Sequence, residues 1–549
     1  MAFKQPRTHA HASPEPPAAP PQESKREAVA PAVQSIAKAV SYHLNGDCEA
    51  ALKELDNALE NGESTAELNA ARGFLLLDLQ RYEEAAQAYS KALELQPGDL
   101  KICFNLGLCL QHRAKHVDAL EQFQKAVAAN PDWLEARVSS GISTLHLKRH
   151  EEAIEIFDEC LRLNPTLEAA LFGKAVAFQL QGKLDDSRKV YEEILAKNPA
   201  SEESLLNMIS LGLQQKDYEL LRDRSRQLLD LRPDHPVALE GLAAASFALG
   251  DSAVAKELCL KLTESAPQIF DHWFNLGIAY QRLGQINDAV QAYTRARALR
   301  PDLAQVHIQL GGLYQEQSDV AAARESFEQA LAHAPGRTDV KYQLAWIVEQ
   351  QGDIERAETL YREIAGANPD HADSHFRLGY MRLQKNDYPA AIDSFRACLA
   401  QRPEWREAEL NLAMAYWKLK QYSNATPVLE NLIQREPSSV EGLRALAAIA
   451  LDEGNTEKAL EYHLHLHKLG ETTPDVLYNS ALLSQKLGKI DDAILLYKAA
   501  LAEKPGFAEA LLNLGHALKA AGKDEEAKAC WIPAIEAKPE LAAGYFSQS

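Results

Sequence analysis

Residues 270–303 read FDHWFNLGIAYQRLGQINDAVQAYTRARALRPDL, and this stretch decides the fold. Apolar and small side chains recur at helical spacing in two runs, one on each side of Gly284. This spacing places the apolar groups of each run on one face of an α-helix, and glycine is typical of the end of a helix. The stretch therefore predicts two short helices that pack together, with Pro301 preventing continuation of the second.

The same stretch recurs along the chain with a period of 34 residues. Thirteen prolines share one register, in which only Glu471 interrupts the series: Pro97, Pro131, Pro165, Pro199, Pro233, Pro267, Pro301, Pro335, Pro369, Pro403, Pro437, Pro505 and Pro539. A strict period indicates one stacked unit, because a single unit of this size cannot bury its own apolar face. The chain is therefore predicted to be an array of repeats.

Small residues occupy two positions of nearly every repeat. Position 8 is Gly or Ala in each repeat from residue 66 onward except one, which has Ile209. Position 20 is Ala or Ser except in the same repeat, which has Leu221. Small side chains at both positions allow the two helices of a repeat to approach closely, and the larger ones are predicted to push them apart.

The repeat at 270–303 resembles the tetratricopeptide repeat (TPR) family in its Trp273, Gly277, Tyr280, Ala289 and Pro301. This resemblance implies an all-α fold, a right-handed superhelical solenoid of tandem helix-turn-helix repeats. Glycine at position 15 of many repeats is predicted to adopt a positive φ and end the first helix. Aspartate at position 16 is predicted to cap the second helix in five repeats: Asp217, Asp251, Asp319, Asp353 and Asp387.

The repeat register predicts six segments. They are a disordered Pro-rich leader at 1–30, a degenerate or capping repeat at 31–65, an N-terminal TPR array at 66–201, a degenerate repeat and joint at 202–235, a C-terminal TPR array at 236–541 and a tail at 542–549. The joint is expected because Ile209, Leu221 and Ser225 depart from the pattern of the other repeats.

Composition restricts the kinds of partner. The formal net charge is −20, which disfavours binding to nucleic acid in the absence of a basic stripe. No apolar run is long enough to span a membrane, and the seven cysteines fit buried thiols in a reducing compartment. The sequence therefore predicts a cytoplasmic protein without membrane insertion.

Catalytic motifs are not found in the sequence, which has no phosphate-binding Gly-rich loop, no His-Glu-x-x-His and no Cys-x-x-Cys. The predicted protein is not an enzyme, and no cofactor or metal is assigned to it. Two histidine pairs 34 residues apart, His112 with His146 and His116 with His150, leave open a metal site or solvated loops.

Asparagine recurs at position 6, where the family's concave surface is lined: Asn105, Asn207, Asn275, Asn411, Asn479 and Asn513. The resemblance implies contact with a peptide main chain, because an amide both donates and accepts. The alternative is hydrogen bonding within the stack. Other residues interrupt the series, among them Gln309 and Gln343.

Aromatic side chains follow consecutive first helices in residues 338–437. We define this aromatic lane as Tyr342, Trp346, Phe376, Tyr380 and Trp417, with Arg377 beside it. Aromatic groups dominate many binding surfaces, yet a helical aromatic stripe also forms cores. Both interpretations remain open at this point. Position 2 is acidic in ten repeats, which indicates either favourable helix dipoles or a rim that selects basic peptides.

These observations predict a non-catalytic scaffold that binds a peptide or helix of partner proteins in the concave groove. Two alternatives remain: a scaffold that self-associates into a homo-oligomer, and a targeting subunit for an enzyme on a separate chain.

Overall fold

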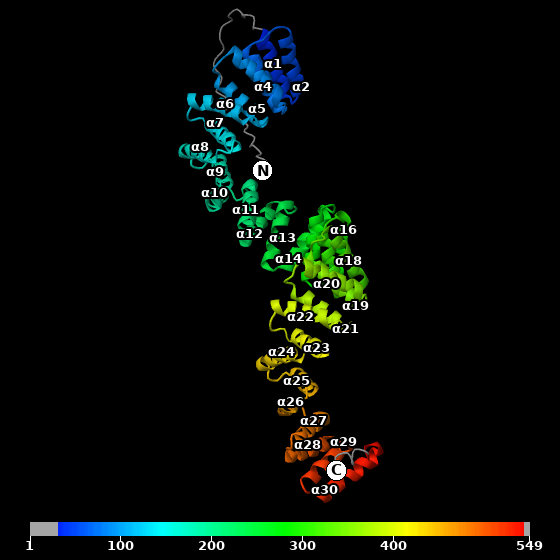
Figure 1. Ribbon diagram of the computed structural model, residues 1–549. Helices are drawn as coiled ribbons and strands as arrows, with labels where there is room; N and C mark the ends of the chain where they lie inside the picture. The colour runs from blue at the N-terminus through cyan, green and yellow to red at the C-terminus, as the bar shows by residue number, and fades with distance from the viewer. Residues whose placement is uncertain (1–30, 543–549) are drawn as a thin grey trace, which may run out of the picture. The chain divides into compact units, whose positions relative to one another are not determined.

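The computed structural model describes residues 31–542 of the chain. This part contains thirty α-helices and one short 3-10 helix, arranged as fifteen helix pairs (Figure 1). The predicted leader at 1–30 and residues 543–549 of the predicted tail lie outside the described residues. Contacts divide the chain into an N-terminal body, Met1–Ala266, and a C-terminal body, Pro267–Ser549.

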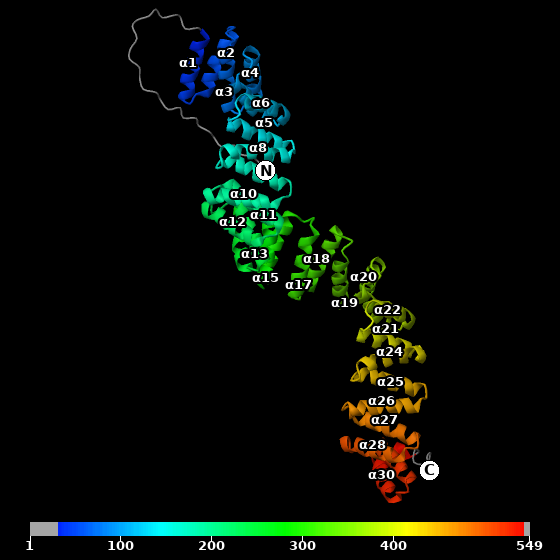
Figure 2. The ribbon, with the colours of Figure 1, turned by 90° about the vertical axis from the view of Figure 1, so that its left-hand side faces the viewer.

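The N-terminal body contains seven helix pairs among its described residues. Its helices are α1 (Pro31–Leu44), α2 (Cys48–Glu60), α3 (Ala66–Asp78), α4 (Tyr82–Leu95), α5 (Leu100–His112), α6 (His116–Ala129), α7 (Leu134–His146), α8 (His150–Leu163), α9 (Glu168–Leu180), α10 (Leu184–Lys197), α11 (Glu202–Gln215), α12 (Tyr218–Leu231), α13 (Pro236–Leu249) and α14 (Ser252–Ser265). Helices that are consecutive in the sequence pack side by side (Figure 2).

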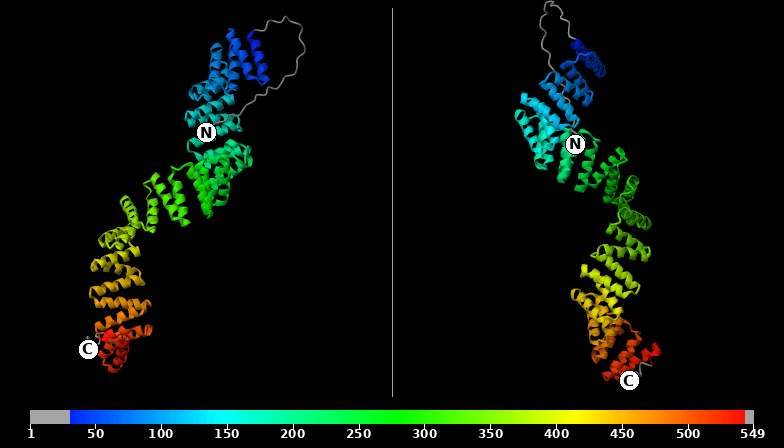
Figure 3. Two further views of the ribbon diagram at one scale, coloured as in Figure 1. Left: turned by 90° about the vertical axis from the view of Figure 1, so that its right-hand side faces the viewer. Right: turned by 45° about the horizontal axis from the view of Figure 1, so that its top comes forward.

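The C-terminal body is built in the same way. Its helices are α15 (Phe270–Arg282), α16 (Ile286–Leu299), α17 (Ala304–Glu316), α18 (Val320–His333), α19 (Thr338–Gln350), α20 (Ile354–Ala367), α21 (Ala372–Gln384), α22 (Tyr388–Gln401), α23 (Arg406–Lys418), α24 (Tyr422–Arg435), α25 (Val440–Asp452), α26 (Thr456–Lys468), α27 (Pro474–Lys486), α28 (Ile490–Glu503), α29 (Ala508–Ala520), α30 (Asp524–Ala537) and the 3-10 helix η1 (Pro539–Leu541). Each first helix contacts the second helix of its own repeat and that of the preceding repeat in this body (Figure 3).

A left-handed residue ends the first helix of all fifteen described repeats. Glycine fills this position in eight of them, as at Gly284 with φ 70°. The other seven use a residue with a side chain, as at Ala114 with φ 58° and Ser318 with φ 61°. The predicted aspartate caps form at Asp217, Asp319, Asp353 and Asp387, each accepting from a backbone N–H. Asp251 stands at the cap position without a side-chain cap bond, so that prediction was wrong.

In seven of the fifteen described repeats, a glycine on the first helix packs against an aromatic ring on the second helix. A Cβ at Gly277 would lie 2.6 Å from Cε1 of Tyr293, whose side chain is fully buried. Real Cβ atoms do not approach this closely, so the ring fits only because the side chain is missing. The same pairing joins Gly107 to Phe123.

In the repeat at 202–235 the first-helix residue is large and the second-helix residue is small, the reverse of the glycine and ring described above. Ile209 replaces the small residue and Ser225 replaces the ring, and a Cβ on Gly241 of the next repeat would meet both. Gly212 makes room for Leu221, whose backbone N would lie 3.1 Å from a Cβ there. The predicted joint at 202–235 lies within the N-terminal body and stays a prediction.

None of the helices in residues 31–542 combines the length and apolar character that crossing a membrane requires.

Candidate functional site

The six position-6 asparagines all lie on first helices. Asn275 is exposed, and the other five are partly buried: Asn105 on α5, Asn207 on α11, Asn411 on α23, Asn479 on α27 and Asn513 on α29. Nδ2 of Asn513 donates to the hydroxyl of Tyr478 at 2.8 Å. At Asn513, therefore, the amide is used for packing between neighbouring repeats.

Two rings of the aromatic lane pack between helices. The ring centroid of Tyr342 lies 5.6 Å from that of Tyr361 and 5.3 Å from that of His371. Phe376 repeats this arrangement, with its centroid 4.4 Å from the stacked ring of Trp405. Both lane rings are partly buried, and burial raises the pKa of Tyr342, so its hydroxyl stays protonated at neutral pH.

The other three rings of the lane are more accessible or only partly packed. Tyr380 is 37% exposed. Trp417 is partly buried, and its indole N–H donates to Asp452 of the next repeat at 2.7 Å. Trp346 packs partly against the buried cluster that includes Ile347. Of the five rings in the lane, only that of Tyr380 is exposed, and the other four are partly buried.

Arg377 forms an ion pair with Glu349 of the preceding repeat. Its Nη1 lies 3.5 Å from Oε1 of Glu349, and the two side chains are 29% and 12% exposed. Glu349 also accepts from the hydroxyl of Tyr361 at 2.9 Å. Burial opposes the charge on Arg377, but Glu349 and the hydroxyls of Tyr342 and Tyr361 together outweigh burial and raise the pKa of the guanidinium. Arg377 therefore contributes to packing between α19 and α21.

A pocket of about 620 Å³ opens between α17 and α19. Four of its lining residues define what we call the glutamine pocket: Gln309, Gly312 and Gln315 on α17, and Gln343 on α19. A Cβ built on Gly312 would meet nothing within 4 Å, so the glycine leaves open space. Within the part of the chain described, none of the three side-chain amides has a hydrogen-bond partner. These amides can therefore still donate and accept.

The acidic residues at position 2 are partly neutralised within the array. Arg337 holds the carboxylate of Asp339 with two hydrogen bonds of 2.9 and 2.7 Å, and it lowers the pKa of that carboxyl. Three more of these acidic residues form ion pairs with basic side chains: Asp373 with Arg402, Glu441 with Arg406, and Glu509 with Lys538. The carboxylate of Glu316 also lies at the edge of the glutamine pocket, and within residues 31–542 it forms no ion pair with a basic group.

The histidines pair differently from the predicted arrangement. His116 stacks on His146 with ring centroids 4.3 Å apart, and His112 stacks on Tyr82 at the same distance. Position 17 of one repeat thus meets position 13 of the next, an offset of 30 residues rather than 34. Burial lowers the pKa of both stacked imidazoles, and for His116 the charge of His146 adds to this effect.

The sequence interpretation did not identify the glutamine pocket. It treated Gln309 and Gln343 as interruptions of the asparagine series, although glutamine carries the same amide on a longer stem. The sequence does contain an indication of this pocket. Gln309, Gly312 and Gln315 are spaced three residues apart, so they share one face of the helix, and the glycine leaves that face open between the two glutamines.

Family models of tetratricopeptide repeats match most of the chain. Three of these descriptions read "Tetratricopeptide repeat", and together they match residues 37–99, 76–140, 268–336, 342–404, 410–464 and 485–543. The fourth, "Psidin, N-terminal TPR repeats region", matches residues 115–265. The search of curated proteins found no match.

Solved structures of repeat proteins also match. YrrB, titled "a TPR protein with an unusual peptide-binding site", is 20% identical and covers 35% of this chain and 98% of its own, with a TM-score of 0.32. PilF of Pseudomonas aeruginosa is 23% identical over 39% of this chain and 97% of its own, with a TM-score of 0.33. A chain of "Naa15/Naa10 bound to HypK-THB" is 13% identical over 94% and 95%, with a TM-score of 0.28.

The helix pairs, the glycine-to-ring packing and the matched family models agree along the length of the chain. This protein belongs to the tetratricopeptide repeat family.

Proposed function

We propose that this protein is a non-catalytic scaffold that binds an extended peptide segment of a partner protein, with the glutamine pocket as the centre of the site. Tetratricopeptide repeats generally mediate protein–protein interactions. The observation that carries the proposal is the set of three unpaired amides around the open space at Gly312.

The chemistry of the pocket suits a peptide main chain. An extended peptide presents alternating N–H and C=O groups, and a side-chain amide can satisfy either. A pocket of about 620 Å³ falls within the size range of small-ligand sites, so it can also admit one side chain of the peptide. The carboxylate of Glu316 at its edge favours a lysine or arginine there.

The aromatic lane extends this surface into the next repeats. Gln343 follows Tyr342 directly on α19, so the pocket and the lane begin on the same helix. The exposed ring of Tyr380 and the partly buried rings of Trp346 and Trp417 would supply apolar contact area beyond the pocket. The position-6 asparagines that lie on other first helices of the C-terminal body would add amide contacts: Asn275, Asn411 and Asn479.

The test selects peptides from a random displayed library on the intact protein. Selected peptides are then measured against a Gly312→Leu variant, whose side chain would fill the open space. Gly366→Leu serves as the matched control, because Gly366 also lies in a helix and a Cβ there meets nothing within 4 Å. We expect Gly312→Leu to weaken binding by at least about tenfold, which corresponds to about 1.4 kcal/mol, and Gly366→Leu to leave it unchanged. Equal binding to both variants would place the peptide site elsewhere.

Self-association is the second candidate, and one surface favours it. Helix α1 exposes Val33, Val40 and Leu44, of which Leu44 is 80% exposed. Light scattering over a range of protein concentrations tests this candidate. A mass that rises with concentration in the parent and not in a Val40→Lys/Leu44→Lys variant supports it, whereas a constant monomer mass excludes it. A targeting role for an enzyme on another chain would use the same peptide site, and the identity of the captured partner decides it.

A further inference from the structure

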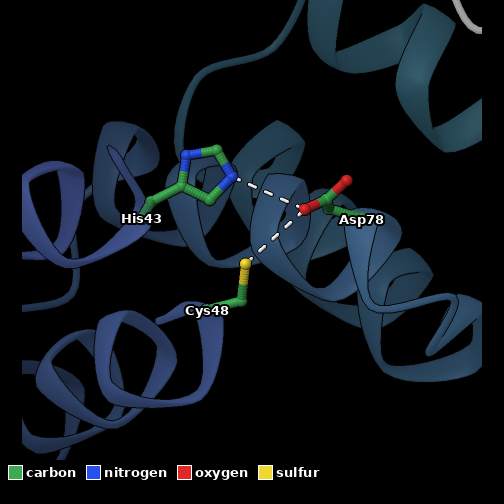
Figure 4. Close-up of side chains that lie close together, drawn as sticks. All are labelled: His43, Cys48 and Asp78. Carbon is green, nitrogen blue, oxygen red and sulfur yellow. Dashed lines mark hydrogen bonds and ion pairs between the residues drawn. The ribbon is translucent and has the colours of Figure 1, made fainter. Parts of the chain in front are cut away.

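Three side chains with metal-ligating atoms converge where the first two repeats meet (Figure 4). His43 lies in the last turn of α1, Cys48 is the first residue of α2, and Asp78 is the last residue of α3. Gly46, with φ 84°, allows the tight turn that brings α2 back beside the end of α1. Each ligand atom thus comes from a different helix.

The spacing of these atoms fits a tetrahedral metal. Nε2 of His43 lies 3.5 Å from Oδ2 of Asp78, and Sγ of Cys48 lies 3.6 Å from the same oxygen. In a tetrahedral zinc site the usual bond lengths set the distances between ligand atoms at about 3.4 to 3.6 Å. The third distance is at most 4.8 Å, and rotation of the partly exposed side chains can shorten it.

The local charge also favours a cation. The charged groups that act most strongly on the thiol of Cys48 are all acidic: Asp78, Asp47 and Glu49. The thiol of Cys48 donates a hydrogen bond to the carboxylate of Asp78. A divalent ion bound here would favour deprotonation of the thiol, because its positive charge stabilises both the thiolate and the carboxylate.

We propose that His43, Cys48 and Asp78 bind one Zn²⁺ ion. Imidazole nitrogen, thiolate sulfur and carboxylate oxygen are the donor types that zinc prefers, and three protein donors leave the fourth position to water. On binding, the thiol of Cys48 releases its proton to solvent, and the sulfur, the imidazole lone pair and the carboxylate form bonds to the metal. The ion clamps α1 and α2 of the repeat at 31–65 onto α3 of the next repeat.

Cobalt titration of the metal-free, full-length chain tests the site. We expect one Co²⁺ per chain with a thiolate-to-cobalt charge-transfer band, which Zn²⁺ then displaces. Cys48→Ser should abolish the band, and His43→Gln and Asp78→Asn should each weaken affinity by at least about 100-fold, because even residues that only support a ligand contribute about 10- to 100-fold.

Two control variants separate this site from other donors. Cys530→Ser removes the other partly exposed free thiol and should leave the titration unchanged. A His9→Ala/His11→Ala variant removes a histidine pair that lies outside the described residues, and it too should keep the band.

Amide exchange provides a second measurement that does not depend on cobalt. Zn²⁺ should slow exchange in α1 of the parent and have no such effect in Cys48→Ser, since a bound ion stabilises the elements that it joins. Absence of a thiolate band at one equivalent of Co²⁺, or identical titrations of the parent and Cys48→Ser, would overturn the proposal.

Discussion

Two adjacent glycines in α17, Gly311 and Gly312, should respond in opposite directions to alanine. Both lie inside the helix, so either substitution gains about 1 kcal/mol of helix propensity. A Cβ at Gly312 meets nothing within 4 Å, and we expect Gly312→Ala to be stabilising by that amount. The neighbouring position differs only in what the new methyl group would contact.

At Gly311 the new Cβ would lie 2.7 Å from Cε1 of Phe327 and 2.8 Å from Cδ1. Unbonded carbons prefer a separation of about 3.5 to 4.0 Å, so the ring must move by most of an ångström. Phe327 is 3% exposed and is enclosed by packed helices, and overpacking of this kind costs about 1 to 3 kcal/mol. Because both variants share the propensity gain, their difference measures this cost directly.

The measurement must resolve a single repeat, because unfolding of a long array is not a two-state process. Hydrogen exchange by mass spectrometry on peptides from α17 and α18 meets this requirement. We expect slower exchange than in the parent for Gly312→Ala and faster exchange for Gly311→Ala. Shifts of the same sign and size in both variants would refute the packing argument.

Three further predictions concern the pKa, hydrogen bonding or accessibility of single side chains. Burial lowers the pKa of His116 and His146 in the folded chain, so the unfolded chain binds more protons below about pH 6.5. The local free energy of unfolding around α6 and α7 should therefore fall as pH decreases through that value, and a His116→Gln variant should show a flatter pH profile of amide exchange in these two helices. Tyr497→Phe removes a 2.8 Å hydrogen bond to Gln485 and should cost about 1 kcal/mol, seen as faster exchange in α28; unchanged exchange would contradict this. Burial raises the pKa of Cys109 to about 12, so iodoacetamide should label it only after the addition of urea.

The repeat pattern predicted the fold because each local signal recurs. The proline register, the small residues and the position-15 turns all indicate the same helix pair, so one departure from the pattern changes little. The repeat at 202–235 shows the limit of this reasoning. The sequence pattern treats Ile209 and Ser225 as two separate departures, whereas in space both side chains lie against Gly241 of the next repeat. A shared contact of this kind becomes visible only when the packing partners in the neighbouring repeat are known.

The candidate site was harder to predict, because its residues come from neighbouring repeats. The histidine interpretation assumed contacts between like positions, 34 residues apart. The start of a second helix in fact meets the end of the next first helix, and this offset of 30 residues joins His116 to His146 and also Cys48 to Asp78. A search of the sequence at this offset would have found both pairs. The open space at Gly312 depends on a missing side chain, which no residue-type motif records.

The left-handed turns have a mechanical consequence. Seven of the fifteen described repeats place a residue with a side chain at this turn, at a cost of about 1 to 2 kcal/mol each relative to glycine. Three of them follow one another, at Gln80, Ala114 and Lys148, whereas glycine fills the position at Gly454, Gly488 and Gly522. Each repeat contacts only its neighbours, so this free-energy cost lowers the stability of the repeat that contains the turn rather than that of the whole array. Under tension, the repeats that contain residues 66–167 would yield before those that contain residues 440–541, and the protein would lengthen in steps.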